Sequence, residues 1–155
     1  MPKVANLANK GSFCDGLKPV YRSRLDELGR EVRFERDQII FREGDESPFF
    51  YVILSGRVSL EVTALGRALR VATLEDGDEL GWSSLLPHRG KQFQARALEG
   101  VRAMALDGAR LREACEHDPA FGYEVMKRLL GVVSERLEAL RMQLFDMYAP
   151  TGGGR

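Results

Sequence analysis

The residues best suited to chemistry lie close together, in the stretch from Gly77 to Leu98. This stretch contains two adjacent serines, Ser83 and Ser84, followed by a basic loop with Arg89 and Lys91. A strand that turns into a one-turn helix exposes backbone N–H groups, which can bind an anion together with hydroxyl donors and a nearby cation. These residues therefore predict a pocket for a small anion, although a surface turn with solvated charges has the same composition.

The overall composition narrows the possible functions. The chain has 155 residues, enough for one domain with a buried core. Lysine plus arginine and aspartate plus glutamate each total 23, so the net charge is zero and a general nucleic-acid binder is disfavoured. Neither a long apolar run nor a secretory signal occurs in the sequence, which predicts a cytoplasmic protein without a membrane segment.

Cysteine and histidine are too sparse to suggest a metal site or a nucleophile. Cys14 and Cys115 do not lie in a C-x-x-C pair and are predicted to be packed thiols in a reducing compartment. A metal-dependent cupin enzyme would need a group of histidines, whereas His88 and His117 are isolated. The sequence also lacks a Gly-x-Ser-x-Gly elbow. We therefore expect a protein that is not an enzyme and binds no metal, with a cupin as the least favoured alternative.

The elements that must position the pocket are mostly strands. One helix is expected from about Lys18 to Arg30, with Gly29 near its end. Strands of similar length then recur, among them the apolar run Phe49 to Leu54 and the alternating run Val58 to Val62. Glycines close these strands and no helical pattern separates them. The pattern predicts an antiparallel sandwich or barrel.

The C-terminal part of the sequence changes to a helical period. Asp107 is predicted to cap a short helix, and a long helix follows from Pro119 to Tyr148. Apolar residues in the long helix alternate at spacings of four and three, which is a heptad seam and predicts a homodimer. The predicted interface residues are Leu130, Val133, Leu137, Leu140, Leu144 and Met147.

The alternative for the long helix is that its apolar residues pack on their own domain. This is expected for Phe121, Val125 and Leu129 at its beginning. A helix of this length reaches roughly 40 Å, more than a small barrel covers, so its far half is predicted to meet a second copy. In a parallel pair the heptad places Arg136 and Arg141 opposite their counterparts. The sequence leaves the direction of the pairing open.

The order of these elements resembles the cyclic-nucleotide-binding domain of the catabolite activator (Crp/Fnr) type over roughly residues 13–148. The likeness is carried by Gly44-Asp45 and by the runs Tyr51 to Val58, Leu74 to Gly81 and Ala95 to Asp107. It implies a mainly β fold, an antiparallel jelly-roll barrel with an N-terminal helix and a long C-terminal dimerisation helix. The chain would be a short single-domain member that lacks the family's DNA-binding helix-turn-helix.

The resemblance also implies a division of the chain. The expected segments are a flexible N-terminus (1–12), a cyclic-nucleotide-binding-like β-barrel domain with its N-terminal helix (13–118), a dimerisation helix (119–148) and a flexible tail (149–155).

The family pocket carries a glutamate that accepts from a ribose hydroxyl and an arginine that holds the cyclic phosphate. The register implied by the resemblance places Trp82 at the glutamate, Lys91 at the arginine and Gln94 at a threonine. Indole has no acceptor for a sugar hydroxyl, and lysine lacks the planar two-point grip of arginine. The ligand-binding residues implied by the resemblance are Gly81, Trp82, Ser83, Ser84, Arg89, Lys91 and Gln94.

The sequence and the resemblance together lead to two candidate functions. In the first, the chain is a homodimeric sensor that binds a small anion, with cAMP or cGMP as the candidate ligand, and signals through its C-terminal helices to a separate partner protein. In the second, Trp82 fills the space of the sugar, and the barrel is a ligand-free scaffold for protein interactions. Neither function involves direct DNA binding or a membrane.

Overall fold

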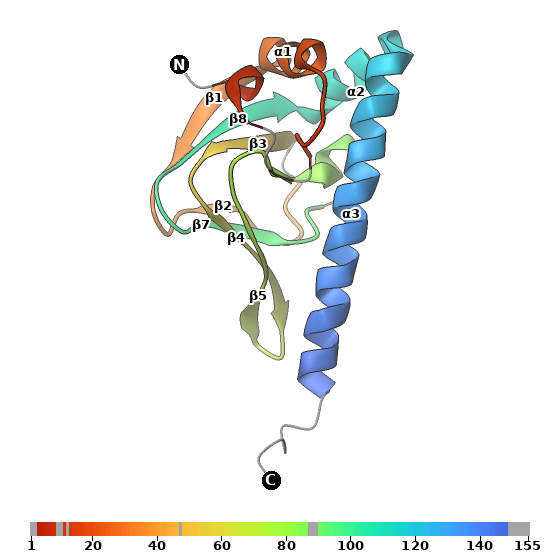
Figure 1. Ribbon diagram of the computed structural model, residues 1–155. Coiled ribbons are helices and arrows are strands. Elements are labelled where there is room, and N and C mark those ends of the chain that lie inside the picture. The colour runs from red at the N-terminus through yellow and green to blue at the C-terminus, as the bar shows by residue number, and fades with distance from the viewer. Residues whose placement is uncertain (1–2, 9–10, 12, 47, 87–89, 149–155) are drawn as a thin grey trace.

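The computed structural model describes residues 3–8, 11, 13–46, 48–86 and 90–148. Two β-sheets lie beside one long helix, and shorter helices cover one end of the sheets (Figure 1). Along the described residues the elements follow in this order: η1 (Val4–Asn6), α1 (Pro19–Leu28), β1 (Gly29–Phe34), β2 (Ile39–Phe41), β3 (Phe49–Ser55), β4 (Val58–Ala64), β5 (Arg67–Leu74), β6 (Glu79–Leu80), η2 (Trp82–Leu85), β7 (Gln94–Ala97), β8 (Val101–Asp107), α2 (Gly108–His117) and α3 (Pro119–Tyr148).

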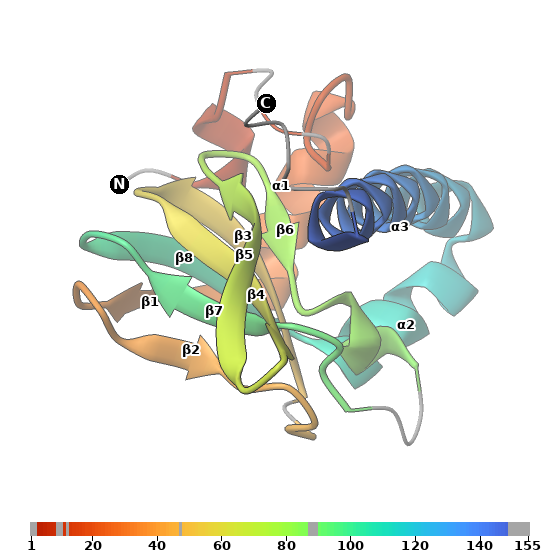
Figure 2. The same cartoon turned by 90° about the horizontal axis from the view of Figure 1, so that it is seen from below.

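The strands of the described residues form two four-stranded sheets. The strand order is β1-β8-β3-β6 in one sheet and β2-β7-β4-β5 in the other, and all pairs are antiparallel. Figure 2 shows the sheets facing each other, with α1, α2 and α3 grouped to one side of them. The predicted fold class, a mainly β jelly roll with an N-terminal helix and a long C-terminal helix, is confirmed.

The sheet that contains β3 and β8 is covered on both faces. In β8, Val101, Ala103 and Ala105 pack toward the other sheet, whereas Met104 and Leu106 pack toward the helices. Strands that are buried on both faces show continuous apolar runs instead of strict alternation. This explains why the sequence of β3 is almost entirely apolar.

The short helices begin and end close to the positions that the sequence predicts. Pro19 is the first residue of α1, which ends immediately before Gly29. The Asp107 side chain accepts hydrogen bonds from the backbone N–H groups of Ala109 and Arg110, at 2.9 and 3.2 Å, and so caps α2. The cap predicted from the sequence is confirmed.

Two side chains of α1 hold the N-terminal segment, because Arg22 donates to the backbone carbonyl of Leu7 and Asp26 accepts from the start of the segment. Val4 is fully buried, and the backbone N–H groups of Val4 and Ala5 donate to the Asp26 carboxylate at 2.9 and 3.0 Å. The segment 1–12, for which the sequence predicts flexibility, therefore includes a residue of the core. The segment is held by Asp26 and Arg22 of α1, and its own local sequence does not reveal these contacts.

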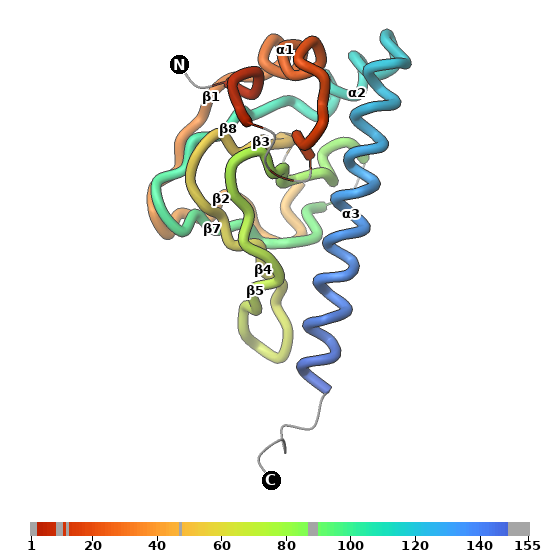
Figure 3. Tube along the Cα trace, viewed as in Figure 1, coloured from red at the N-terminus to blue at the C-terminus, as the bar shows by residue number. Residues whose placement is uncertain are grey.

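The long helix α3 runs along the side of both sheets and continues beside the β4–β5 hairpin (Figures 1 and 3). Phe121, Val125 and Leu129 are at most 6% exposed and pack on their own domain, as predicted. Arg136 lies on the same buried stripe, so the expectation that it would face its counterpart in a dimer is wrong. Neither α3 nor any other helix in the described ranges is long and apolar enough to cross a membrane.

The buried thiol of Cys14 predicts a loss of stability at alkaline pH. Burial raises its pKa from 9.0 to about 12, and Arg22 opposes this shift. Between these values the unfolded chain releases the thiol proton while the folded protein keeps it, so stability falls as pH rises, by up to about 1.4 kcal/mol per pH unit. Urea denaturation at pH 8, 9 and 10 should show a shallower decline for Cys14→Ala than for the natural protein. Parallel declines in the two proteins would contradict the assignment.

Candidate functional site

A small cavity lies where the two sheets meet α3. Its free volume is about 10 Å³, close to the space that a single water molecule needs. Pockets that hold ligands of drug size are far larger, roughly 300–1,000 Å³. The cavity is lined by Phe41, Leu60, Gly81, Trp82, Ser83, Lys91, Gln92, Phe93 and Arg136.

The turn between β6 and η2 forms one wall of the cavity. Gly81 has a φ of +88°, a left-handed conformation that favours glycine. A Cβ atom at this position would lie only 2.8 Å from the carbonyl oxygen of Phe49 and 3.0 Å from Nζ of Lys91. The glycine therefore allows β3 and the lysine to approach the start of η2 closely.

Two hydroxyl groups on η2 are buried. The Oγ atoms of Ser83 and Ser84 have no hydrogen-bond partner among the described residues, and Ser83, which is 3% exposed, lines the cavity. Buried polar groups are nearly always hydrogen-bonded in folded proteins. An unsatisfied hydroxyl in a cavity wall is therefore a candidate contact for a polar ligand.

The Lys91 ammonium group contacts the Gly81 turn. It donates to the carbonyl oxygens of Phe49 and Gly81, at 2.9 and 3.1 Å, and lies 5.2 Å from the ring centre of Phe41. Burial lowers its pKa to about 8, and Glu79 opposes this shift. The group therefore remains protonated at neutral pH, and its hydrogen bonds hold the turn in place.

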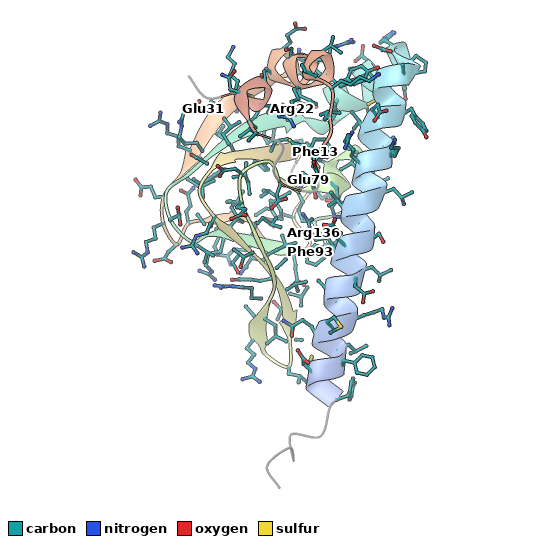
Figure 4. The ribbon with its side chains drawn as sticks, in the orientation of Figure 1. Phe13, Arg22, Glu31, Glu79, Phe93 and Arg136 are labelled. Atoms are coloured by element: carbon teal, nitrogen blue, oxygen red, sulfur yellow. The ribbon has the colours of Figure 1, made fainter. Side chains whose placement is uncertain are left out.

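An ion pair between β6 and α3 lies beside the cavity, and its arginine, Arg136, is part of the lining. Arg136 Nη1 lies 2.9 Å from Glu79 Oε1, and Arg136 Nη2 donates to the backbone carbonyl of Glu79 at 3.0 Å. Figure 4 labels Glu79, Arg136 and Phe93 close together between the sheets and α3, and Arg136 and Phe93 line the same cavity. Glu79 is fully buried and Arg136 is 5% exposed. Burial raises the pKa of the Glu79 carboxyl, and Arg136 opposes this effect.

Gln94 lies away from the cavity. Its amide nitrogen donates to Glu61 Oε1 at 2.8 Å, and its amide oxygen accepts from Arg42 at 3.4 Å. Ala95, the next residue of β7, is fully buried in the core between the sheets, and successive side chains of a strand point to opposite faces. Gln94 therefore belongs to the outer face of its sheet.

The structure thus brings together Gly81, Trp82, Ser83 and Lys91 at one cavity, places Ser84 beside it, and separates Gln94 from it. Arg89, the remaining candidate, lies outside the described residues. Sequence reasoning did not identify Glu79 and Arg136 as parts of the site. One signal was present, because Arg136 interrupts an otherwise apolar helical stripe.

The outward face of α3 carries an apolar stripe. Leu130, Leu137 and Leu144 are 71%, 61% and 53% exposed. Of the other predicted interface residues, Met147 is exposed, Val133 is half-buried, and Leu140 is half-buried against the core between the sheets. A stripe of large exposed apolar side chains of this kind often marks an interaction surface.

The described residues contain no group of three or more histidine, cysteine, aspartate or glutamate side chains that could hold a metal ion.

Comparisons with known proteins agree with this architecture. A CRP-like cAMP-activated global transcriptional regulator of Mycobacterium tuberculosis is 28% identical over 150 residues, which cover 96% of this chain. The chain spans 65% of the length of that curated relative. The catabolite activator protein of Thermus thermophilus has the same fold, with a TM-score of 0.72 at 24% identity, over 88% of this chain and 62% of the other.

A cyclic nucleotide-binding domain from Methylobacillus flagellatus also shares the fold, with a TM-score of 0.68 at 20% identity, over 86% of this chain and 74% of the other. The sequence profile of the cyclic nucleotide-binding domain matches residues 31–118, which is more than half of the chain. The chain belongs to the cyclic nucleotide-binding domain family and is a regulatory domain of the CRP type.

Proposed function

We propose that this chain is a homodimeric, non-enzymatic regulator that binds a small anionic ligand, a cyclic nucleotide or another anion, at the cavity between η2 and α3. The observation that carries the proposal is the position of Arg136: a cation on α3 forms part of the wall of the cavity that also contains Lys91 and the Ser83 hydroxyl. An anion bound there would contact the helix directly. Its binding energy could therefore change the position of α3.

The exposed stripe of α3 supports the homodimer. Burying each of its leucines would contribute roughly 1.5–3 kcal/mol, and the stripe offers several of them to a second copy. A ligand that shifts α3 would then change the geometry of the paired helices. We propose that a separate protein partner reads this change in the cytoplasm, where the free thiols Cys14 and Cys115 would stay reduced.

The ligand-free scaffold remains the second candidate, and one observation favours it. The cavity has room for about one water molecule, and Trp82 is part of its wall. A cyclic nucleotide could enter only if Trp82 or α3 moved. In the scaffold, this closed arrangement would be permanent.

A thermal-shift titration with cAMP, cGMP and a panel of small organic acids separates the two candidates. If the protein is a sensor, one of these compounds should stabilise it increasingly with its concentration, by about 2.7 kcal/mol at 100 times Kd. The exposed Arg33→Ala, which removes a cation far from the cavity lining, should respond like the natural protein, and Ser83→Ala should respond more weakly. A natural protein that no compound stabilises, combined with a cAMP response in Trp82→Glu, would establish the scaffold instead.

A further inference from the structure

We infer that Glu79 is an internal competitor for the ligand: its carboxylate occupies the guanidinium group of Arg136 that an anionic ligand would bind. This inference rests on the proposed anion site and deepens it by assigning a regulatory element to the site. The ligand would bind by taking Arg136 from Glu79. The competition would keep the ligand-free protein closed.

The geometry of Arg136 supports this role. Both terminal nitrogens of its guanidinium group are used, one by the side-chain oxygen of Glu79 and one by its backbone carbonyl. A guanidinium group presents a planar pair of donors that matches the two oxygens of a carboxylate or a phosphate. Glu79 therefore provides, within the chain, the type of group that an external anion would present to the same donors.

The incomplete hydrogen bonding around the pair points in the same direction. Oε2 of the fully buried Glu79 has no hydrogen-bond partner among the described residues, and neither has Oγ of Ser83. An ion pair that serves only to hold α3 would be expected to satisfy its buried oxygens, because an unsatisfied buried group is destabilising. The closed arrangement therefore retains unused hydrogen-bonding capacity at the cavity, which an anion with several oxygens could use at Ser83.

The position of Arg136 along α3 connects the exchange to the helix. Val132, before it, is fully buried in the core that the helices form with β3 and β8. The helix after Arg136 contacts the sheets mainly through Leu140 and Gln143. Gln143 donates to the backbone carbonyl of Arg70 at the β4–β5 hairpin. Release of Arg136 from Glu79 would thus remove the most buried attachment of the far half of the helix.

The ligand class follows from these groups. The site should favour an anion that presents two oxygens to Arg136 and a further oxygen to Ser83, which describes a phosphate ester or a compact carboxylate with an additional hydroxyl or keto oxygen. An anion with a single exposed charge and no second acceptor, such as chloride, could not replace the two-point contact that Glu79 provides.

Isothermal titration with cAMP and with inorganic phosphate tests the inference on three proteins. These are the natural chain, Glu79→Gln and the matched control Glu61→Gln, which neutralises another buried carboxylate that hydrogen-bonds to Gln94 on the outer face of a sheet. The apparent affinity of a site is reduced by the fraction of molecules in the closed state, so Glu79→Gln should bind at least one probe about tenfold or more tightly than the natural protein. Glu61→Gln should bind like the natural protein. The double variant Glu79→Gln/Arg136→Gln should lose the gain.

The outcomes separate the inference from the proposed function. If the natural protein binds a probe and Glu79→Gln binds it equally or more weakly, the anion site stands and the competitor role is overturned. If Glu79→Gln binds a probe and the natural protein does not, the competitor role is supported. The proposal that the natural protein binds the anion is then overturned. If no protein binds either probe, both are overturned. Should Glu79→Gln fail to fold, Glu79→Asp, whose shorter side chain withdraws the carboxylate from Arg136, is expected to tighten binding in the same way, and an unchanged Kd would reject the inference.

Discussion

Replacing Arg136 with methionine is expected to lower the free energy of unfolding by about 3–5 kcal/mol at neutral pH, because it leaves a buried carboxylate without its counter-charge. The Glu79 side chain has no contact with solvent, and Arg136 forms the ion pair with its carboxylate. Methionine retains much of the aliphatic length of arginine, so the loss should come mainly from the charge. Urea denaturation at fixed protein concentration measures the change.

The loss should depend on pH in a definite direction. Burial already raises the pKa of Glu79, and removing Arg136 raises it further. An acid with a raised folded pKa binds more protons in the folded than in the unfolded state, so stability declines as pH rises through the interval between the two pKa values. The deficit of Arg136→Met should therefore be smallest in mild acid and largest near neutral pH.

Two further variants control this experiment. Arg141→Met removes an arginine from the same helix whose partner, Glu138, is exposed, and an exposed ion pair contributes only about 0–1 kcal/mol. The double variant Arg136→Met/Glu79→Leu removes both charges and should recover most of the lost stability, because an apolar pair of similar size often replaces a buried ion pair without loss. A cost below about 1 kcal/mol for Arg136→Met alone would contradict the role of the pair.

Leu137→Glu is expected to convert the proposed homodimer into monomers. Leu137 is 61% exposed near the middle of the apolar stripe, and a symmetric interface contains the substitution twice. Losing roughly 1.5–3 kcal/mol of apolar burial in each copy corresponds to an increase of about 10²–10⁴-fold in the dimer Kd. Sedimentation equilibrium over a range of protein concentrations measures this shift.

Met142→Glu is the matched control for the dimer. Met142 is 56% exposed on the same helix but does not belong to the stripe that contains Leu137. This variant should keep the association constant of the natural protein. If Met142→Glu dissociates the protein and Leu137→Glu does not, the interface lies on another face of α3, and a natural protein that is monomeric at every concentration would remove the dimer from the proposed function.

Much of the fold could be predicted from the sequence, because its determinants are local. Glycine turns, strand-length apolar runs and the change to a helical period predict an antiparallel sandwich or barrel followed by helices, and the family resemblance specifies a jelly roll. The cap at Asp107 depends on hydrogen bonds within one turn. The burial of Phe121 and Val125 followed from their spacing on α3. In each case the relevant neighbours lie within a few residues, where patterns of hydrophobicity and capping are informative.

The candidate site could be predicted only in part. The run Gly81 to Ser83 and Lys91 come from one continuous segment, so the sequence already placed them near one another. Gln94 was assigned to the pocket by resemblance. Side chains alternate between the two faces along β7, so Ala95 packs in the core and Gln94 lies on the outer face. A shift of one residue in the register of a strand moves every side chain to the opposite face of the sheet. The side-chain contacts on both faces decide which register is adopted.

By itself, the sequence determined an antiparallel β fold followed by a long C-terminal helix, which its resemblance to a known family specified as a jelly roll. It also predicted a turn at Gly81 that could bind an anion. Only the tertiary structure decided that the turn is closed, because the closure depends on Glu79 and Arg136, which are 57 residues apart. Glutamate and arginine are also common at protein surfaces, so the residue types alone do not reveal the buried pair. Their pairing becomes strong only when packing of α3 on the sheets removes water from both, and that desolvation is a property of the assembled fold and not of any local segment.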